Sequence, residues 1–479
     1  MIRNRLAFLM LGAGLSVMSV ELYAVENPPQ EAISPLNCAR VESLALAQHP
    51  ILAEKALEMD KSREVLREIE MGAILPKFEV ETGIGPAPGI RTSIDSSLVV
   101  NRTKDAIYRT TKTFDYSDWG PFFGVQMKVA QPLNIARFLS GKKAAQYKIA
   151  VSSAEFQKER MEISEEIQTL YYQRLQAITM HGILESARRE LDKGQKKMVE
   201  QLDAGEDGVS QTDLLQLKSG RFALEQGFNE SQLGMDRTAL AMNFYLGFLV
   251  KSPPVLADST LGLRAEAIPS LDSLKQITLR DHPDLKRLEN GLAARKELLK
   301  VAQGEMGPDL FLFGSFTYSK AWSSDRQTGG NDPFARDPLN EITGVAGVGM
   351  TLRLNFWQRY QKYRKERWEF RQLKQTEVYA ARGLLLKMED AYVRLVKAKS
   401  DAEEAQKALR ASEAWLKGAA MKYDLDPSTG KDLIAPFRQT IFAKRDYYAT
   451  VLEYNLSVAR LIKSLGWTLS DYLRNLSPR

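Results

Sequence analysis

The strongest constraint on the fold is that most of the sequence occurs twice. The segment QHPIL at 48–52 returns as DHPDL at 281–285, and GVQM at 124–127 returns as GVGM at 347–350. Landmarks that recur in the same order indicate a structural repeat. We therefore expect a first repeat over 25–247, a linker rich in turn-forming residues over 248–269, a second repeat over 270–466 and a C-terminal tail over 467–479.

The N-terminus has the layout of a secretory signal peptide. Arg3 and Arg5 precede an apolar stretch over 6–20, and Ala24 offers a small residue for cleavage. A short buried helix is the alternative, but nothing amphipathic follows to support it. We therefore expect residues 1–24 to be a signal peptide. Beyond it no apolar run is long enough for a transmembrane helix, so a membrane span would have to consist of strands.

Each repeat reads as a helix, a β-hairpin, a long helix, a turn and another helix. The long segments contain no proline, and Ala391, Leu395 and Ala398 follow the spacing of a coiled-coil seam. A helix of about 65 residues would be about 100 Å long, so it must be a rod, part of a bundle or a stave of a larger barrel. The proline of each His-Pro pair suits a first helical turn, so His49 and His282 are expected to start helices rather than to bind a ligand. The expected hairpins cover about 77–132 and 309–356, the long helices about 138–202 and 357–422, and the helices that follow about 212–247 and 431–466.

One strand of each hairpin alternates between apolar and polar residues, and the two repeats agree on which positions are apolar. The apolar positions are Val125, Met127, Val129, Val348, Met350 and Leu352, and the polar positions between them are Gln126, Lys128, Thr351 and Arg353. A soluble hairpin with one buried face and a membrane-barrel strand share this pattern. Because the chain is exported and each hairpin is flanked by long helices, we expect the apolar set to face lipid and the polar set to face a lumen. Four strands cannot close a barrel, so identical chains would have to share one, in a number that closure alone does not fix.

Charge and motif content point away from other functions. The formal net charge is +6, but Lys and Arg are interspersed with acidic residues, as at 362–371, which is typical of solvated helix faces rather than of a nucleic-acid interface. The single cysteine and three histidines have no metal-ligand spacing. The SGKK segment at 140–143 and the glycines of 83–89 lack the partner motifs of an active site. We therefore expect no cofactor, no metal, no nucleic-acid partner and no enzyme activity. A periplasmic coiled-coil scaffold is the alternative, although it gives the hairpins no role.

The ordered whole resembles the TolC family of outer-membrane export channels over about residues 38–466. The resemblance rests on the doubled layout, the His-Pro helix starts, and the parallel between TDLL at 212–215 and KDLI at 431–434. It implies a mixed α and β membrane protein that forms a homotrimer: a twelve-stranded transmembrane β-barrel to which each chain gives four strands, and a long antiparallel α-helical coiled-coil barrel in the periplasm. The loops at about 85–118 and 320–343 would lie outside the cell, and the turns at about 203–211 and 424–431 would form the periplasmic tips. The implied partners are a periplasmic adaptor and an inner-membrane pump, serving efflux or type I secretion.

The resemblance also implies a periplasmic aperture. Channels of the family often close their tunnel with rings of acids, in the pattern of an acid, two apolar residues and a second acid. Asp432 fits the first acid, but Ala435 stands at the second. Tyr423 matches an aromatic residue before the second tip, Asp426 lies across the turn, and Asp213 occupies the equivalent place in the first repeat. An acid in a first helical turn also favours the helix dipole. We weigh capping and aperture lining equally for Asp432 and prefer capping for Asp213.

Overall fold

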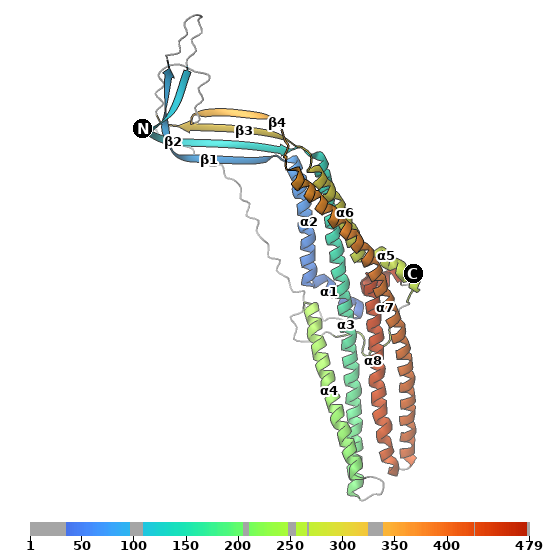
Figure 1. Cartoon of the computed structure of the whole chain (residues 1–479). Helices are drawn as coiled ribbons and strands as arrows, with labels where there is room; N and C mark the ends of the chain where they lie inside the picture. Colours follow the sequence, from blue (N-terminus) through green and yellow to red (C-terminus); the bar gives the residue numbers. More distant parts are fainter. Residues whose placement is uncertain are drawn as a thin grey trace, which may run out of the picture.

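The chain forms a long, narrow molecule with a β-sheet at one end and helices that run away from it to a distant tip (Figure 1). The computed structural model describes residues 35–95, 109–204, 210–247, 255–265, 268–323, 339–425 and 427–476. The predicted signal peptide and Asp426 lie outside these residues. Within the described residues, no helix contains an apolar stretch long enough to cross a membrane.

The order helix, helix, strand, strand, long helix, helix occurs twice along the chain. It first comprises α1 (Cys38–Gln48), α2 (Pro50–Ile74), β1 (Lys77–Asp95), β2 (Arg109–Pro132), α3 (Ile135–Asp203) and α4 (Gln211–Tyr245). It then comprises α5 (Leu271–Asp281), α6 (Pro283–Gly304), β3 (Asp309–Ala321), β4 (Glu341–Thr351), α7 (Phe356–Leu425) and α8 (Ile434–Ser464). A 3₁₀ helix, η2 (Pro427–Leu433), precedes α8, and α9 (Leu469–Leu476) ends the described chain. The mixed α and β fold expected from the sequence is confirmed, but residues predicted to be a C-terminal tail include the helix α9.

The four strands form one antiparallel sheet in the order β1-β2-β3-β4. The pairing of β1 with β2 shifts between Pro88 and Gly89, where three residues of β2 bulge out. Beyond this irregularity the hairpin turns away from the plane of the sheet (Figure 1). A bulge bends a strand in this way because the extra residues have no partner opposite them. Among the described residues, β1 and β4 each pair on one side only.

The helices form a layer of four staves, a stave being one long helix or two helices stacked end to end. The order across the layer near the sheet is α2, α3, α6, α7, and near the tip it is α4, α3, α8, α7 (Figure 1). The long helices α3 and α7 have 69 and 70 residues, so each is about 100 Å long. The predicted seam of α7 is confirmed, because Ala391, Leu395 and Ala398 are buried.

Two glycines allow the short helices to stack. Gly466, just after α8, has a φ of +84°, and a Cβ there would lie 2.6 Å from Cδ of Pro283 at the start of α6. Gly247, just after α4, has a φ of +66° and lies against Gln48, beside the start of α2. Glycine accepts a positive φ and has no Cβ, so both joints need it. The two prolines occupy first helical turns, as the sequence predicted for His49-Pro50 and His282-Pro283.

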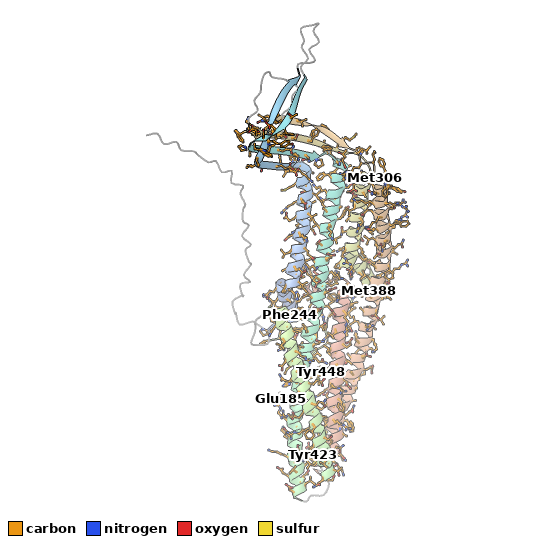
Figure 2. All side chains as sticks on the ribbon, turned by 60° about the vertical axis from the view of Figure 1, so that its left-hand side comes forward. Glu185, Phe244, Met306, Met388, Tyr423 and Tyr448 are labelled. Carbon is orange, nitrogen blue, oxygen red and sulfur yellow. The ribbon has the colours of Figure 1, made fainter. Side chains whose placement is uncertain are left out.

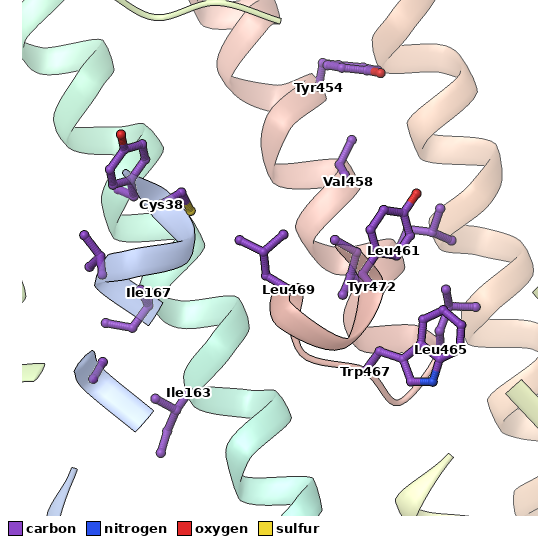
Figure 3. Packing of buried hydrophobic residues seen from close by; sticks show 14 of the residues in the cluster. Cys38, Ile163, Ile167, Tyr454, Val458, Leu461, Leu465, Trp467, Leu469 and Tyr472 are labelled. Atoms are coloured by element: carbon purple, nitrogen blue, oxygen red, sulfur yellow. The ribbon is translucent and has the colours of Figure 1, made fainter. Parts of the chain in front are cut away.

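The main apolar core lies at the level of these joints, where α1 and α9 pack against α3 and α8 (Figure 3). The carboxylate of Glu42, fully buried in α1, accepts hydrogen bonds from the backbone N–H groups of Leu469 at 2.8 Å and Ser470 at 3.0 Å. It therefore satisfies the N-terminus of α9 and fastens that helix to α1, and these bonds offset the cost of burying a charge.

Candidate functional site

The register of the sheet separates the two predicted sets of strand residues. Val125, Met127 and Val129 lie opposite Tyr318, Phe316 and Gly314 of β3, and Val348 and Met350 lie opposite Leu312 and Leu310. Directly opposed residues of antiparallel strands share a face, and neighbours along a strand alternate between faces. The five apolar positions within the strands therefore share one face, whereas Gln126, Lys128 and Thr351 lie on the other. Leu352 and Arg353 follow the end of β4.

The apolar face of the sheet is open. Ile84 is 83% exposed and Val348 is 69% exposed, and most other large side chains of this face are exposed too. They include Phe78, Val80, Met127, Leu310, Leu312, Phe316, Ile342 and Met350. No described helix covers this face (Figure 1). A continuous apolar surface of this kind marks contact with another protein or with lipid.

The opposite face carries charged and polar groups. Lys128 Nζ lies 3.1 Å from Oε2 of Glu81 on the neighbouring strand, and Ser315 and Thr317 of β3 face the same way. Two aromatic residues, Phe311 and Phe313, also lie on this face, as their alternation with Leu310 and Leu312 in the sequence predicts. Their rings cover the glycines opposite them on β4, so that a Cβ at Gly349 would lie 2.5 Å from the ring of Phe311. Glycine alternates with apolar residues over 347–350, which leaves room for these rings.

At the far end of the molecule, Asp432 pairs with a lysine. Lys422, in the last turn of α7, places Nζ 2.7 Å from Oδ2 of Asp432 in η2. Lys422 directly precedes Tyr423, which the resemblance placed at the aperture, whereas Asp426 lies outside the described residues. Capping does not account for Asp432, because α8 begins after Leu433 without a side-chain hydrogen bond at its N-cap.

Tyr423 connects α7 to α3. Nζ of Lys197, on α3, lies 5.7 Å from the centre of the Tyr423 ring, within the range of a cation–π contact. A Cβ at Gly430 would lie 3.3 Å from the same ring, so the turn packs closely on it. Figure 2 shows Tyr423 near the tip of the helices.

Asp213 caps its helix, in agreement with the preferred interpretation. Its backbone N–H donates to Oγ of Ser210 at 3.2 Å, while its carboxylate accepts from the Ser210 backbone N–H at 3.0 Å. This reciprocal pair is a capping box. Hydrogen bonds from Ser210 lower the pKa of the Asp213 carboxyl, and the positive charge of Lys431 acts in the same direction.

An open groove separates the helical hairpin α3–α4 from the hairpin α7–α8. It has a volume of about 1460 Å³ and extends from Gln173 down to Tyr423 and Gly430. A small apolar cluster of Leu184, Leu224, Phe437 and Ile441 lies at its base. Groups of the tip and of both hairpins therefore meet along one surface.

The architecture of the whole chain matches solved outer-membrane channels. CmeC of Campylobacter jejuni superposes with a TM-score of 0.67 at 17% identity, over 92% of this chain and 88% of that chain. MtrE of Neisseria gonorrhoeae gives a TM-score of 0.68 at 14% identity, over 90% and 89% of the two chains. The chain has the outer-membrane channel fold. VceC of Vibrio cholerae gives a TM-score of 0.64 at 14% identity, over 90% of this chain and 96% of that chain.

The predicted resemblance to the TolC family is thus confirmed for the fold. No protein-family model matches the sequence. No curated protein matches it either. At such low identity the likeness is one of structure, and the roles of individual residues in this outer-membrane channel fold rest on their own geometry.

Proposed function

We propose that the chain is the outer-membrane channel of a tripartite export system, conducting substrates from a pump complex to the outside of the cell. The observation that carries this proposal is the uncovered apolar face of the sheet, placed at the end of helices about 100 Å long. Contact with lipid would remove this apolar face from water, and the polar face with Lys128 and Gln126 would line the lumen.

The two open edges of the sheet support a barrel shared between chains. Unpaired backbone groups on β1 and β4 would be costly in hydrocarbon, so β4 of one copy would pair with β1 of the next. The resemblance to the TolC family sets the number of copies at three and hence the barrel at twelve strands. The repeat of the element order within the chain supports an internal two-fold repeat, so a barrel of three chains would have six similar units.

The charges of the outer staves support the same closure of the helical layer. Residues 356–386 of α7 include eight basic and three acidic residues, whereas α2 has six acidic and four basic residues. Arg364, Arg371 and Trp368 are exposed on α7, and Glu64 and Glu68 are exposed on α2. In a ring of three copies, the basic edge of one chain would meet the acidic edge of its neighbour.

The tunnel would extend from the outer membrane through the periplasm, where its tip would meet a periplasmic adaptor and an inner-membrane pump. Efflux and type I secretion both fit this arrangement. Conduction needs no catalytic group. A coiled-coil scaffold without a barrel would leave the apolar sheet face in water, which the observed exposure of Val348 and Ile84 disfavours.

Cell fractionation followed by conductance measurement tests the proposal. The protein should remain with outer membranes until detergent is added, migrate as a trimer in detergent, and open ion-conducting pores in planar bilayers. Recovery as a soluble periplasmic protein would favour the scaffold. A folded monomer in detergent would contradict the shared barrel.

A further inference from the structure

A polar pocket lies at the joint where the end of α8 meets the start of α6. Its volume is about 460 Å³, and residues from α3, α6, α7 and α8 line it. Basic groups outnumber acidic groups in its wall. The basic residues are Lys158, Lys387, Arg394, Arg460 and Lys463, and the acidic residues are Glu162, Asp284 and Asp390.

The carboxylates of the pocket already have cationic partners. Asp390 Oδ2 lies 2.7 Å from Arg394, and Lys158 lies 3.8 Å from Glu162 and 3.7 Å from Asp284. Arg460 and Lys463 pair with acids beyond the pocket. Lys387 makes no ion pair with any residue that the structure describes. Its ammonium group, which has three donors and no acceptor, is therefore available to a ligand.

His282 presents a second donor. Its ring is 3% exposed, and Nδ1 accepts a hydrogen bond of 3.2 Å from the backbone N–H of Asp284. Burial lowers the pKa of this imidazole, and Lys158 and Lys387 lower it further against the influence of Asp284. A neutral ring that accepts at Nδ1 carries its proton on Nε2. That N–H has no acceptor among the described residues.

Ser457 presents a third donor. The residue is 1% exposed, and its Oγ is buried without a hydrogen-bond partner in the described part of the chain. A buried hydroxyl that makes no hydrogen bond is unfavourable, because it has lost its hydrogen bonds to water. Ser457 lines the same pocket as His282 and Lys387, so the three donors border one cavity.

The first His-Pro joint shows that a helix can start in this backbone conformation without a polar pocket beside it. His49 and His282 have nearly the same conformation, with φ and ψ of −67° and 124° against −62° and 123°. Yet the ring of His49 stacks on Tyr245 at 5.2 Å, and both of its ring nitrogens are buried without a hydrogen-bond partner among the described residues. The second joint differs because its histidine borders a pocket that Lys387 and Ser457 also line.

We propose that this pocket binds a tetrahedral oxyanion, either a free phosphate ion or the phosphate group of a small molecule, through Lys387, His282 Nε2–H and the Ser457 hydroxyl. Donors without acceptors are complementary to a ligand that has several acceptor oxygens. Asp284 Oδ1 makes no hydrogen bond with the described residues, but a metal cation would have to compete with the lysine and arginine groups that pair with Asp284, Glu162 and Asp390. The volume exceeds that of a phosphate ion and leaves room for an attached group. The inference does not depend on the proposed channel function.

Calorimetry and thermal unfolding of the purified protein in detergent test the site. Inorganic phosphate and phenyl phosphate, a monoester, are each titrated against sodium chloride of equal ionic strength. A ligand that binds only the folded chain raises its unfolding temperature, so phosphate should raise it and chloride should not. Binding of the monoester as well assigns the site to a phosphate group on a small molecule, and binding of the free ion alone assigns it to an ion. Both results support the site.

Substitutions test whether phosphate binds in this pocket. Lys387→Met should weaken phosphate binding at least ten-fold, and it leaves no carboxylate without a partner. Lys387 and Lys399 are both exposed on the same helix, but Lys399 does not line the pocket, so Lys399→Met is the matched control and should bind like the parent. Ser457→Ala should weaken binding without unfolding the protein. The proposal is overturned if neither oxyanion binds, so that the pocket holds only water, or if Lys387→Met and Ser457→Ala both bind like the parent. Trimer formation and conductance, scored separately, report on the channel.

Discussion

Lys422 and Asp432 join the last turn of α7 to η2, with Nζ and Oδ2 separated by 2.7 Å. The side chain of Lys422 is 60% exposed and that of Asp432 is 45% exposed, so solvent screens the pair and it contributes little to stability, about 0–1 kcal/mol. Its importance would lie in the position of two opposite charges at the tip.

Removal of the acid at the tip should change conduction more than stability. In a trimer, three copies of Asp432 would gather negative charge at the mouth of the tunnel, and such rings favour cations. We expect Asp432→Ala to lower cation selectivity or to raise basal conductance in planar bilayers, with the trimer intact. Lys422→Met is the matched change and should raise cation selectivity, because it leaves the acid unpaired. Unchanged conductance in both variants would mean that the pair only shapes the turn.

A second acid should strengthen the same effect. Ala435 stands where the family pattern has its second acid, one residue after Ile434 begins α8. We expect Ala435→Asp to raise the permeability ratio of potassium over chloride, and an acid in the first turn of α8 should also favour its dipole. Ala435→Asn is the uncharged control. Equal cation selectivity in the two variants would indicate that Asp432 and its neighbours do not line the aperture.

Asp213 should affect the order of α4 rather than conduction. Loss of the cap in Ser210→Ala should destabilise the start of α4 by about 0.5–2 kcal/mol, and Asp213→Ala should act in the same direction. Hydrogen exchange of the amides at 211–217 measures this loss. Because the pKa of Asp213 is lowered in the folded chain, its contribution is present above the pKa of about 3.9 that the unfolded carboxyl has. It should disappear as the pH falls through the lower, folded value. An equal effect of Asp213→Ala at pH 7 and at pH 2 would contradict this assignment.

The sequence predicted the large elements because their signals are long and repeated. The proline-free runs predicted α3 and α7, and the alternation at Val125–Val129 and at Val348–Met350 predicted which side chains share a sheet face. The repeat made each signal count twice, since the same pattern had to serve both copies.

The contacts at the tip were harder to predict because they depend on single side chains. Lys422 and Asp432 are ten residues apart across a turn. A shift of one residue along α7 would place Tyr423 instead of Lys422 beside Asp432. The helix α9 is short, and a carboxylate of α1 more than 400 positions earlier fastens it. No local pattern at 467–479 reveals such a partner.

Charge reversal should test how the helical layers of neighbouring copies meet. Arg364→Glu with Arg371→Glu would place acids on the α7 edge, opposite the acidic residues of α2 in the next copy. Each exposed pair is worth about 0.2–1 kcal/mol, so the two changes in three interfaces should reduce trimer yield several-fold at low salt. Glu64→Lys with Glu68→Lys in the same chain should restore the yield. If the parent protein is a trimer and these two lysine substitutions do not restore the trimer yield, a different face of α7 lies at the interface.

The two faces of the sheet should differ sharply in their tolerance of a charge. Met127 lies on the apolar face, paired with Val80 and Phe316, and its neighbour Gln126 lies on the polar face. Met127→Arg should cost about 2–4 kcal/mol if it lies near the middle of the bilayer, whereas Gln126→Arg should have a small effect on stability.

The depth of a residue along the strand matters as well. Met350 is the penultimate residue of β4, beside the helices, so Met350→Arg should cost less, about 0–1 kcal/mol near an interface, and Thr351→Arg should resemble it. The yield of heat-resistant oligomer in outer membranes measures all four variants. A loss confined to Met127→Arg would support both the lipid-facing assignment and the depth. Similar yields for Met127→Arg and Gln126→Arg would show that the apolar face does not lie against hydrocarbon.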